Sequence, residues 1–488
     1  MELLDYIVLI AYGLAVTGIG LFAGRGQSGT DDYLMGGRSI PWLASTASVI
    51  ATAISCKSLI GLPGLSYARD LTYLQMYLVV PVAAWLVSVV LLPHFGRMQI
   101  TSAYQYLGKR FSPAVQSFGS VIFQVETAVV LGTVIAAPCL VLSESTGLSY
   151  GASVVLFMAA TVLYTSFGGI RSVVWTDVLQ FAIFSSVPVL VVWYALGTID
   201  GGFSAVVSTA QQHGKLRVFD FSFDLKSEMT FWAALASMIF WHGSSYGSNQ
   251  VIVQRYMTAA SPGECRKTML WGSVGSVLLW AQFLAIGVLL FAYGQSHPGE
   301  LPGPGEPDRV FTSFVMGVLP GGLRGAYIAA ALAAGMSTLS GMLNSLGTVT
   351  LVDVWKLHFD DGATEQKWVR RARALTVLWG IFSFGAAFFV LSFGTVITAG
   401  IKLGSILSGA LLGMFLLGVF VPRANARGAV AGALAGVAAV VALMIQASIS
   451  WSWYCGIGTV VTVAAGYLVS LFVERAAGES KLRRAEGI

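Results

Sequence analysis

Long apolar stretches recur from one end of the chain to the other. Runs close to or above 18 apolar residues include residues 4–22, 74–92, 178–196 and 430–445. A run of this length matches the thickness of the hydrocarbon layer of a bilayer when it is helical. Counted along the whole sequence, the pattern predicts an all-α integral membrane protein with about thirteen transmembrane helices.

Two of these stretches are interrupted by polar residues and glycines. The second, residues 41–68, carries serines and threonines, Lys57 and then the sequence Gly61-Leu62-Pro63-Gly64, where we expect the helix to be interrupted; the seventh, residues 231–256, carries a polar, glycine-rich run from His242 to Gln250. Backbone groups freed at membrane depth are tolerated only against protein, ligand or water. Since the two spans lie five apart, they suggest the first helices of two inverted five-helix repeats. The alternative is that small residues only let helices pack closely.

The composition agrees with a membrane protein. Hydrophobic residues make up 56% of the chain and charged residues 10%, which is too much apolar surface for a water-soluble core. If the N-terminus lies outside, 20 of the 28 Lys and Arg residues, Arg171 and Arg255 among them, fall on the cytoplasmic side and six outside. This asymmetry is a topological signal, so the net charge of +5 gives no reason to expect nucleic-acid binding. Only Lys57 and Lys402 remain within or near spans.

A polar stripe marks the ninth span, residues 329–350. Its hydroxyl and amide residues are spaced three or four apart, so they share one helix face: Ser337, Thr338, Ser340, Asn344, Ser345 and Thr348. Sodium prefers such hard, weakly charged oxygen ligands, together with carbonyls of a broken helix. Each hydroxyl can instead bond back to the carbonyl one turn earlier. The adjacent pair Ser337 and Thr338 favours a sodium site.

Seven segments, in order along about 430 residues, resemble the sodium:solute symporter family. They are GGRSIPW (36–42), GLPGLSYA (61–68), SAYQYLGKRF (102–111), GGIRSVVWTDVLQ (168–180), NQVIVQRY (249–256), AALAAGMSTLSGMLNS (330–345) and FLLGVFVPRANARGA (415–429). The resemblance implies one membrane transporter domain over 1–488, with a LeuT-like inverted-repeat core of ten helices, two of them discontinuous, at 41–421. An extra helix would precede the core at 1–24, two would follow at 428–474, and a cytoplasmic tail would occupy 475–488.

The resemblance also implies the ion sites. The main sodium site would use the backbone carbonyls of Ala51, Ile54 and Ala334 and the side-chain oxygens of Ser337 and Thr338. Some relatives hold a second cation, which here would involve Asp177, Ser337, Ser340 and the position of Gly341, where the expected hydroxyl is missing. Asp177 could equally pair with Arg171 or cap a helix.

The solute is expected at the midplane between the broken helices. The resemblance places in its wall Lys57, Ser58, Gln75, Tyr77, His242, Ser245 and Tyr246. An ammonium group at this depth needs a partner. For Lys57 this is either a solute carboxylate, with His242 and Lys402 adding to a cation-lined pocket, or the carboxylate of Glu126 in the fourth span. The two could also alternate during transport.

These features predict sodium-coupled symport of a small organic anion, a carboxylate or sugar acid, by alternating access in a bacterial plasma membrane. Na+ is the expected coupling ion, and no obligatory protein partner is indicated. Symport of a neutral sugar or amino acid and proton coupling through Glu126, Asp177 or His242 remain alternatives on the same fold. A sensor that does not transport is a remote one, and no residue set predicts an enzyme.

Overall fold

The computed structural model describes the backbone of residues 1–27, 29–303, 305–360, 362–392, 396–447 and 449–485, and the side chains in these ranges outside 391–403 and 474–485. All regular structure in these ranges is helical. The helices are α1 (Leu3–Ala23), α2 (Thr30–Met35), α3 (Trp42–Ala53), α4 (Cys56–Ala68), α5 (Leu74–Leu78), α6 (Val80–Val90), α7 (Leu92–Met98), α8 (Gln105–Arg110), α9 (Pro113–Thr146), α10 (Tyr150–Thr198), α11 (Gly202–Gln212), α12 (Phe231–Ala233), α13 (Ile239–Gly247), α14 (Gln250–Tyr256), α15 (Pro262–Ser296), α16 (Pro307–Val318), α17 (Leu323–Val349), α18 (Lys356–His358), α19 (Glu365–Ser392), α20 (Val396–Phe420), α21 (Ala426–Gln446) and α22 (Tyr454–Ala485).

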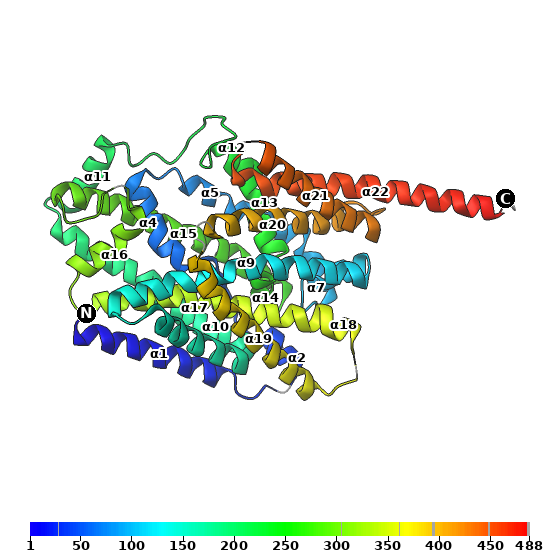
Figure 1. Ribbon diagram of the computed structural model, residues 1–488, viewed down its shortest axis with the longest axis horizontal. Helices are drawn as coiled ribbons and strands as arrows, with labels where there is room; N and C mark the ends of the chain where they lie inside the picture. The colour runs from blue at the N-terminus through cyan, green and yellow to red at the C-terminus, as the bar shows by residue number, and fades with distance from the viewer. Residues whose placement is uncertain (28, 304, 361, 393–395, 448, 486–488) are drawn as a thin grey trace.

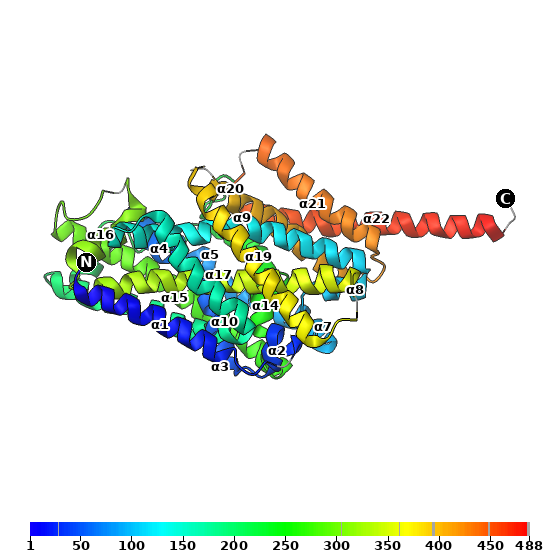
Figure 2. The same cartoon turned by 60° about the horizontal axis from the view of Figure 1, so that its bottom comes forward.

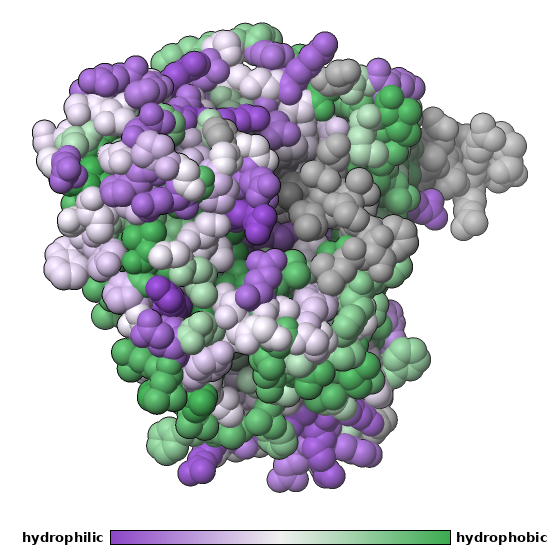
Figure 3. Space-filling model, turned by 60° about the vertical axis from the view of Figure 1, so that its left-hand side comes forward, coloured by the Kyte–Doolittle hydropathy of each residue, from purple (hydrophilic) through white to green (hydrophobic). Residues whose placement is uncertain are grey.

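The long helices run along one common direction, with α1 on one edge of the bundle and α21 and α22 on the opposite edge (Figures 1 and 2). In between lies α17, which is the most buried of the eight long apolar helices. In its most apolar stretch of 18 residues, 83% of the residues are inside the protein. Large hydrophobic side chains cover much of the outer surface, for example Phe22, Trp193 and Phe472. On the end that carries α11 and α16, hydrophilic side chains gather over the upper part of the face (Figure 3). The bundle thus has the surface of a protein whose solvent is lipid along its sides and water at its ends.

Among the described residues, eight helices are long and apolar enough to cross a bilayer, and ten when two bent pairs are each taken as one span. The 49-residue α10, one of the eight, consists of two helices joined at a kink, because Gly169 has non-helical angles of φ 55° and ψ −151°. A further apolar segment in α20, Gly404–Phe420, is shorter than a full span. The all-helical membrane fold is confirmed, and the number of thirteen crossings stays a prediction.

The break in the second span is two residues long. Ile54 and Ser55 are extended between α3 and α4, and the two helices meet at an angle of 59°. The sequence-based expectation of an interruption at Gly61–Gly64 was wrong, since α4 continues through it to Ala68. Gly64 instead permits close packing: a Cβ there would lie 2.1 Å from the carbonyl oxygen of Pro307. Proline and glycine are compatible with a membrane helix when neighbouring segments satisfy the backbone.

The break in the seventh span lies at Ser248 and Asn249, between α13 and α14. The side chain of Asn249 accepts a hydrogen bond of 2.9 Å from the amide of Val251 and so caps the start of α14. A residue with a short polar side chain is favoured at this position because it satisfies an amide that the helix leaves free. The predicted polar run therefore contains the break at its end.

α1 is fixed to the start of α17 by one carboxylate. Asp5 is fully buried and accepts hydrogen bonds from the amides of Gly322 (2.7 Å) and Gly325 (2.8 Å). These amides belong to the first turn of α17, which has no intrahelical acceptor for them. The first helix of the chain therefore caps the helix that carries the predicted sodium ligands.

We expect the Asp5→Ala variant to lose about 1–2 kcal/mol of stability, because two amides of α17 lose their acceptor. The measurement is the midpoint of thermal unfolding of the purified protein in detergent. Glu144→Ala, which removes an exposed carboxylate at the end of α9, is the matched control. Equal midpoints for the two variants would contradict the capping role.

Candidate sodium and solute sites

Three of the five predicted sodium ligands meet at Thr338. Its Oγ1 lies 3.0 Å from the carbonyl oxygen of Ala334, one turn earlier on α17, and 3.3 Å from that of Ile54. Ile54 is the extended residue at the end of α3, so its carbonyl is free of the helical hydrogen-bond pattern. The break in the second span and the polar face of α17 thus bring hard oxygen atoms together from two helices.

The other two predicted ligands are Ser337 and Ala51. Ser337 is fully buried, and its Oγ has no hydrogen-bond partner among the described residues. Ala51 lies in the last turn of α3, where carbonyl groups lack a following helical amide. An unpaired buried hydroxyl costs about 1–3 kcal/mol unless water or a ligand satisfies it. The residues therefore fit a small hard cation, which is the cargo expected here.

The carboxylate of Asp177 forms an ion pair that the sequence did not reveal. Nη2 of Arg255 lies 3.1 Å from Oδ2 of Asp177, and both side chains are fully buried. Ser48 on α3 donates to the same Oδ2 at 2.5 Å and accepts from Nε of Arg255 at 2.9 Å. The alternative pairing with Arg171 is not formed, since Arg171 lies near Ser39 instead.

Arg255 was expected among the basic residues of a cytoplasmic loop and is instead one of the largest fully buried side chains. Its apolar neighbours Val251, Ile252 and Val253 are the one local signal of burial. Its partner Asp177 lies 78 positions away in sequence, so the pair could not be predicted. Ser340, the other proposed ligand of a second cation, donates its hydroxyl to the carbonyl of Ser337 at 3.1 Å.

An aromatic cluster forms where α5, α13 and α15 meet. Tyr77 stacks on Trp280 with ring centroids 4.0 Å apart, and His242 lies 6.4 Å from Tyr77 and 6.3 Å from Trp280. Tyr77 and His242 were predicted; Trp280 was not, because it lies in an unbroken apolar span. Its indole Nε1 is buried without a hydrogen-bond partner in the described part of the chain. The cluster thus offers an N–H group that could donate a hydrogen bond to a solute oxygen.

Three other predicted solute residues have protein partners. Gln75 binds the loop that follows α11, donating to the carbonyl of Met229 at 2.7 Å and accepting from the amide of Asp220 at 3.3 Å. Ser245 donates back to the carbonyl of Trp241 at 3.1 Å, and the hydroxyl of Tyr246 faces Ser276 on α15. Ser58 is half-buried in the first turn of α4.

Lys57 and Glu126 do not form the ion pair that was one alternative. Oε1 of Glu126 accepts a hydrogen bond of 2.5 Å from Ser408 on α20, and the carbonyl of Ser408 accepts one from Ser244 on α13 at 3.0 Å. Lys57, half-buried in the first turn of α4, has no salt bridge among the described side chains. The side chain of Lys402 lies outside the described residues.

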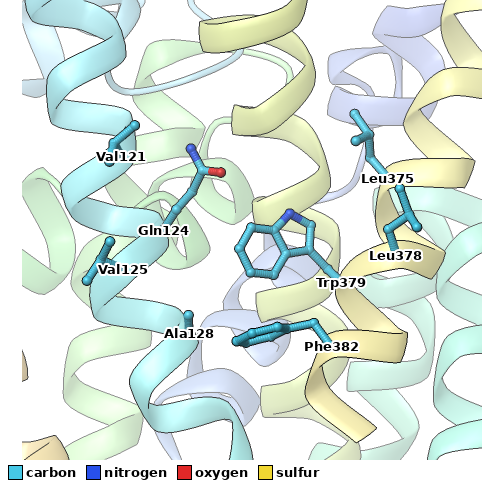
Figure 4. Close-up of a pocket in the computed structure, with 8 residues that line it drawn as sticks. All are labelled: Val121, Gln124, Val125, Ala128, Leu375, Leu378, Trp379 and Phe382. Carbon is cyan, nitrogen blue, oxygen red and sulfur yellow. The ribbon is translucent and has the colours of Figure 1, made fainter. Parts of the chain in front are cut away.

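A groove of about 360 Å³ runs between α9 and α19 (Figure 4). Its lining is almost wholly apolar: Val121, Gln124, Val125, Ala128, Leu375, Leu378, Trp379 and Phe382. Leu378 and Phe382 are 58% and 51% exposed, so the groove opens to the lipid-facing surface. None of the predicted ion or solute residues lines it.

The model of the sodium:solute symporter family matches residues 33–436. The chain belongs to this family. The sodium/iodide cotransporter of Homo sapiens is 32% identical over 442 residues, which are 88% of this chain and 67% of the relative. The sodium/sialic acid symporter NanT of Aliivibrio fischeri is 30% identical over 476 residues, 96% of this chain and 93% of the relative.

Solved structures agree with the family assignment. A sodium-coupled sialic acid symporter, described in its substrate-bound, outward-open state with a novel sodium site, matches with a TM-score of 0.90 and 28% identity over 96% of this chain and 98% of that one. Mhp1, a nucleobase-cation-symport-1 family transporter, matches with a TM-score of 0.54 at 13% identity over 93% of this chain and 96% of that one. The expected LeuT-like inverted-repeat fold is confirmed. The protein is therefore a multi-pass membrane transporter of a symporter family, and sodium is its coupling ion.

Proposed function

We propose that this symporter takes up a small organic anion, a carboxylate or sugar acid, together with sodium. The observation that carries the proposal is Lys57, a cation at membrane depth in a broken span without an acidic partner among the described side chains. Such a group is costly unless it is neutralised. Glu126, the acidic alternative from the fourth span, is engaged by Ser408, so a solute carboxylate is the partner that fits.

The aromatic cluster supports a solute with polar edges and an apolar face. Stacked Tyr77 and Trp280 present ring surface, while Nε1 of Trp280 and the ring of His242 supply polar groups. α4, which carries Lys57 and Ser58, packs against α15, which carries Trp280. Several relatives are named for anionic solutes, namely iodide, sialic acid and monocarboxylates, which favours the same class.

Sodium would bind first, between the carbonyls of Ala51, Ile54 and Ala334 and the hydroxyls of Ser337 and Thr338. By joining α3 to α17 it would complete the solute site before the protein opens to the other side. One charge moving down ~150 mV contributes about 3.5 kcal/mol, and a tenfold sodium gradient adds about 1.4 kcal/mol. A single coupled sodium ion is therefore sufficient to concentrate a solute by roughly a thousandfold or more.

The orientation and domain plan follow from the same proposal. The distribution of Lys and Arg supports an N-terminus outside and a C-terminus in the cytoplasm, and the proposed location is a bacterial plasma membrane. Residues 41–421 form the transporting core. The helices at 1–24 and 428–474 flank it, and the predicted tail begins at residue 475, within α22, which continues to Ala485.

The test is thermal stabilisation of the purified protein by a panel of carboxylates, sugar acids, neutral sugars and amino acids, each with and without sodium. We expect stabilisation by an anionic solute only when sodium is present, and its loss in Lys57→Ala. Lys109→Ala, which removes an exposed lysine on α8, is the matched control. Stabilisation of the wild type and Lys57→Ala alike by a neutral sugar or amino acid would make Lys57 structural and overturn the anion proposal. Sodium-independent stabilisation that strengthens at acidic pH would favour proton coupling.

A further inference from the structure

The groove between α9 and α19 has no part in the proposed ion and solute sites. Gln124 and Trp379 project towards each other from its two walls (Figure 4). Both meet the hydroxyl of Thr350: Nε1 of Trp379 donates to it at 3.1 Å, and it lies 2.9 Å from Oε1 of Gln124. These polar groups are paired with one another, so the surface that the groove offers to a ligand is apolar.

The groove continues towards the end of the bundle where α9 and α19 begin. Thr350 also lines a second hollow of about 450 Å³, together with Val354, Trp355 and Phe359. Phe359 is 67% exposed, so this hollow is open to the surface as well. Because the same threonine joins the two hollows, they form one continuous apolar surface, which we call the α9–α19 groove.

Basic side chains follow directly on the apolar wall of this groove. Lys367, Arg371, Leu375, Leu378 and Phe382 succeed one another at spacings of three or four on α19, so they share one face of the helix. The last three line the groove. The same face therefore passes from an apolar surface to two cations within one turn.

Arg371 lies among aromatic rings at this end of the groove. Its guanidinium is 5.3 Å from the ring centroid of Trp355 and 4.5 Å from that of Trp368. Nζ of Lys356 lies 5.5 Å from the Trp368 ring. Tryptophan and basic residues are typical of the level of the lipid headgroups. Since Trp355 lines the groove, its apolar surface and the positive charge adjoin each other.

The charge at the start of α19 is positive. The first three turns of this helix carry four basic residues and one acidic residue, Glu365. Glu365 accepts hydrogen bonds from the amide and the hydroxyl of Thr30, and the buried Asp353 accepts from Ser102 and Gln116. Both carboxylates are thus engaged by the protein, and this end of the groove is complementary to an anion.

The length of the groove fits one acyl chain. The rise of an α-helix places Phe382 about 16 Å from Arg371 along α19. Half of the hydrocarbon core of a bilayer is about 15 Å thick. The face from Arg371 to Phe382 therefore reaches from the headgroups of one leaflet to the middle of the membrane, and an anionic group and an apolar chain bound along it can belong to one molecule.

We propose that the α9–α19 groove binds one anionic phospholipid, with its phosphate at Arg371 and Lys367 and one acyl chain along Leu375, Leu378 and Phe382. The lipid belongs to the leaflet at which α9 and α19 begin, which is the cytoplasmic leaflet in the proposed orientation. Neither the solute nor the sodium ligands enter this inference. It adds a lipid site to the proposed transport function.

The test is native mass spectrometry of the purified full-length protein in detergent, with phosphatidylglycerol and phosphatidylcholine of the same acyl chains added in equal amounts. The wild type is expected to retain one phosphatidylglycerol per chain in preference to phosphatidylcholine. Each basic group near a membrane surface raises the affinity for an anionic lipid roughly fivefold. The double variant Arg371→Gln/Lys367→Gln should therefore bind phosphatidylglycerol about twenty- to thirtyfold more weakly. Arg423→Gln/Arg427→Gln, which removes two exposed arginines near the start of α21, is the matched control and should bind as the wild type does.

A second variant tests the apolar part of the groove. Ala128 lines the groove at the end that lies away from Arg371, so Ala128→Phe fills the space for the chain and leaves every charge in place. We expect it to retain roughly tenfold less phosphatidylglycerol. Its thermal midpoint without added lipid shows that the protein has kept its fold.

Several outcomes would overturn the proposal. Equal retention of the two lipids by the wild type would remove the role of charge, and so would equal binding by the Arg371→Gln/Lys367→Gln variant and its control. Undiminished binding by Ala128→Phe would place the chain elsewhere. Displacement of the lipid by millimolar glycerol phosphate would mean that the cations bind a free anion, and a dimer that excludes lipid would mean that a second copy covers the groove. If Arg371→Gln does not fold, Lys367→Gln, expected to bind roughly fivefold more weakly, and Ala128→Phe decide.

Discussion

Thr338→Ala is expected to weaken sodium binding by roughly ten- to a hundredfold, the equivalent of about 1–3 kcal/mol. The Thr338 hydroxyl is the point where the carbonyls of Ile54 and Ala334 converge, at 3.3 and 3.0 Å. Without it the ion loses one ligand, and α3 loses a contact with α17. Because sodium would prepare the solute site, sodium-driven uptake should fall by a similar factor. The measurement is the sodium concentration for half-maximal thermal stabilisation of the purified protein.

Thr338→Ser is the matched control, because it keeps the hydroxyl and removes one methyl group. It should retain sodium affinity within a few-fold. An unchanged sodium affinity in Thr338→Ala would show that the hydroxyl serves only as a back-bonding group of α17, the ordinary role of threonine within a helix. A loss of affinity in Thr338→Ser as large as in Thr338→Ala would point to packing and not to ligation.

The second large effect is expected at the buried ion pair. Asp177→Asn and Arg255→Met should each lower the free energy of unfolding by about 3–5 kcal/mol, because each leaves one charge without its partner inside the protein. Stability would be measured by thermal unfolding in detergent. The double variant should be clearly more stable than the sum of the two single changes predicts, since it buries no unpaired charge.

An additive double variant would contradict this account. It would mean that the two charges are each satisfied separately, Asp177 by Ser48 and Arg255 by the carbonyl of Val251. The exposed pair of Arg309 and Glu306, which lies at 3.0 Å with both side chains mostly exposed, serves as a control cycle. There the coupling should stay within about 1 kcal/mol, because water screens exposed charges.

The two predictions concern one connected region. Ser337 and Thr338 are adjacent on α17, one beside the Asp177 carboxylate and the other beside the break in the second span. α3 contributes Ser48 to the ion pair and Ile54 to the sodium set, within two turns of the same helix. A change in sodium occupancy can therefore reach the pair through α3 and α17 without any intervening loop. This proximity is the physical basis for testing the two sites with the same stability measurement.

The sequence by itself determined the solvent and the type of fold. A helix that crosses a bilayer must be apolar over a minimum length, because it has to span the hydrocarbon layer. The spans could therefore be predicted from hydropathy alone. It also determined the polar stripe of the ninth span, to which Ser337 and Thr338 belong, because residues three or four positions apart on a helix share a face. The polar, glycine-rich interruptions indicated the two broken helices, and the segments shared with the sodium:solute symporters supported sodium as the coupling ion.

The tertiary structure decided which polar groups meet. The second span breaks at Ile54 and Ser55 and not at Gly61–Gly64, because packing partners such as Pro307 accept a continuous helix there. Trp280 joins Tyr77 and His242 only through the contact of three helices. Arg255, which was predicted to lie in a cytoplasmic loop, pairs with Asp177, 78 positions away in sequence. The energy of an ion pair or a ring contact depends on the distance between two side chains in space. A local sequence pattern cannot predict that distance when the two segments meet only in the folded chain.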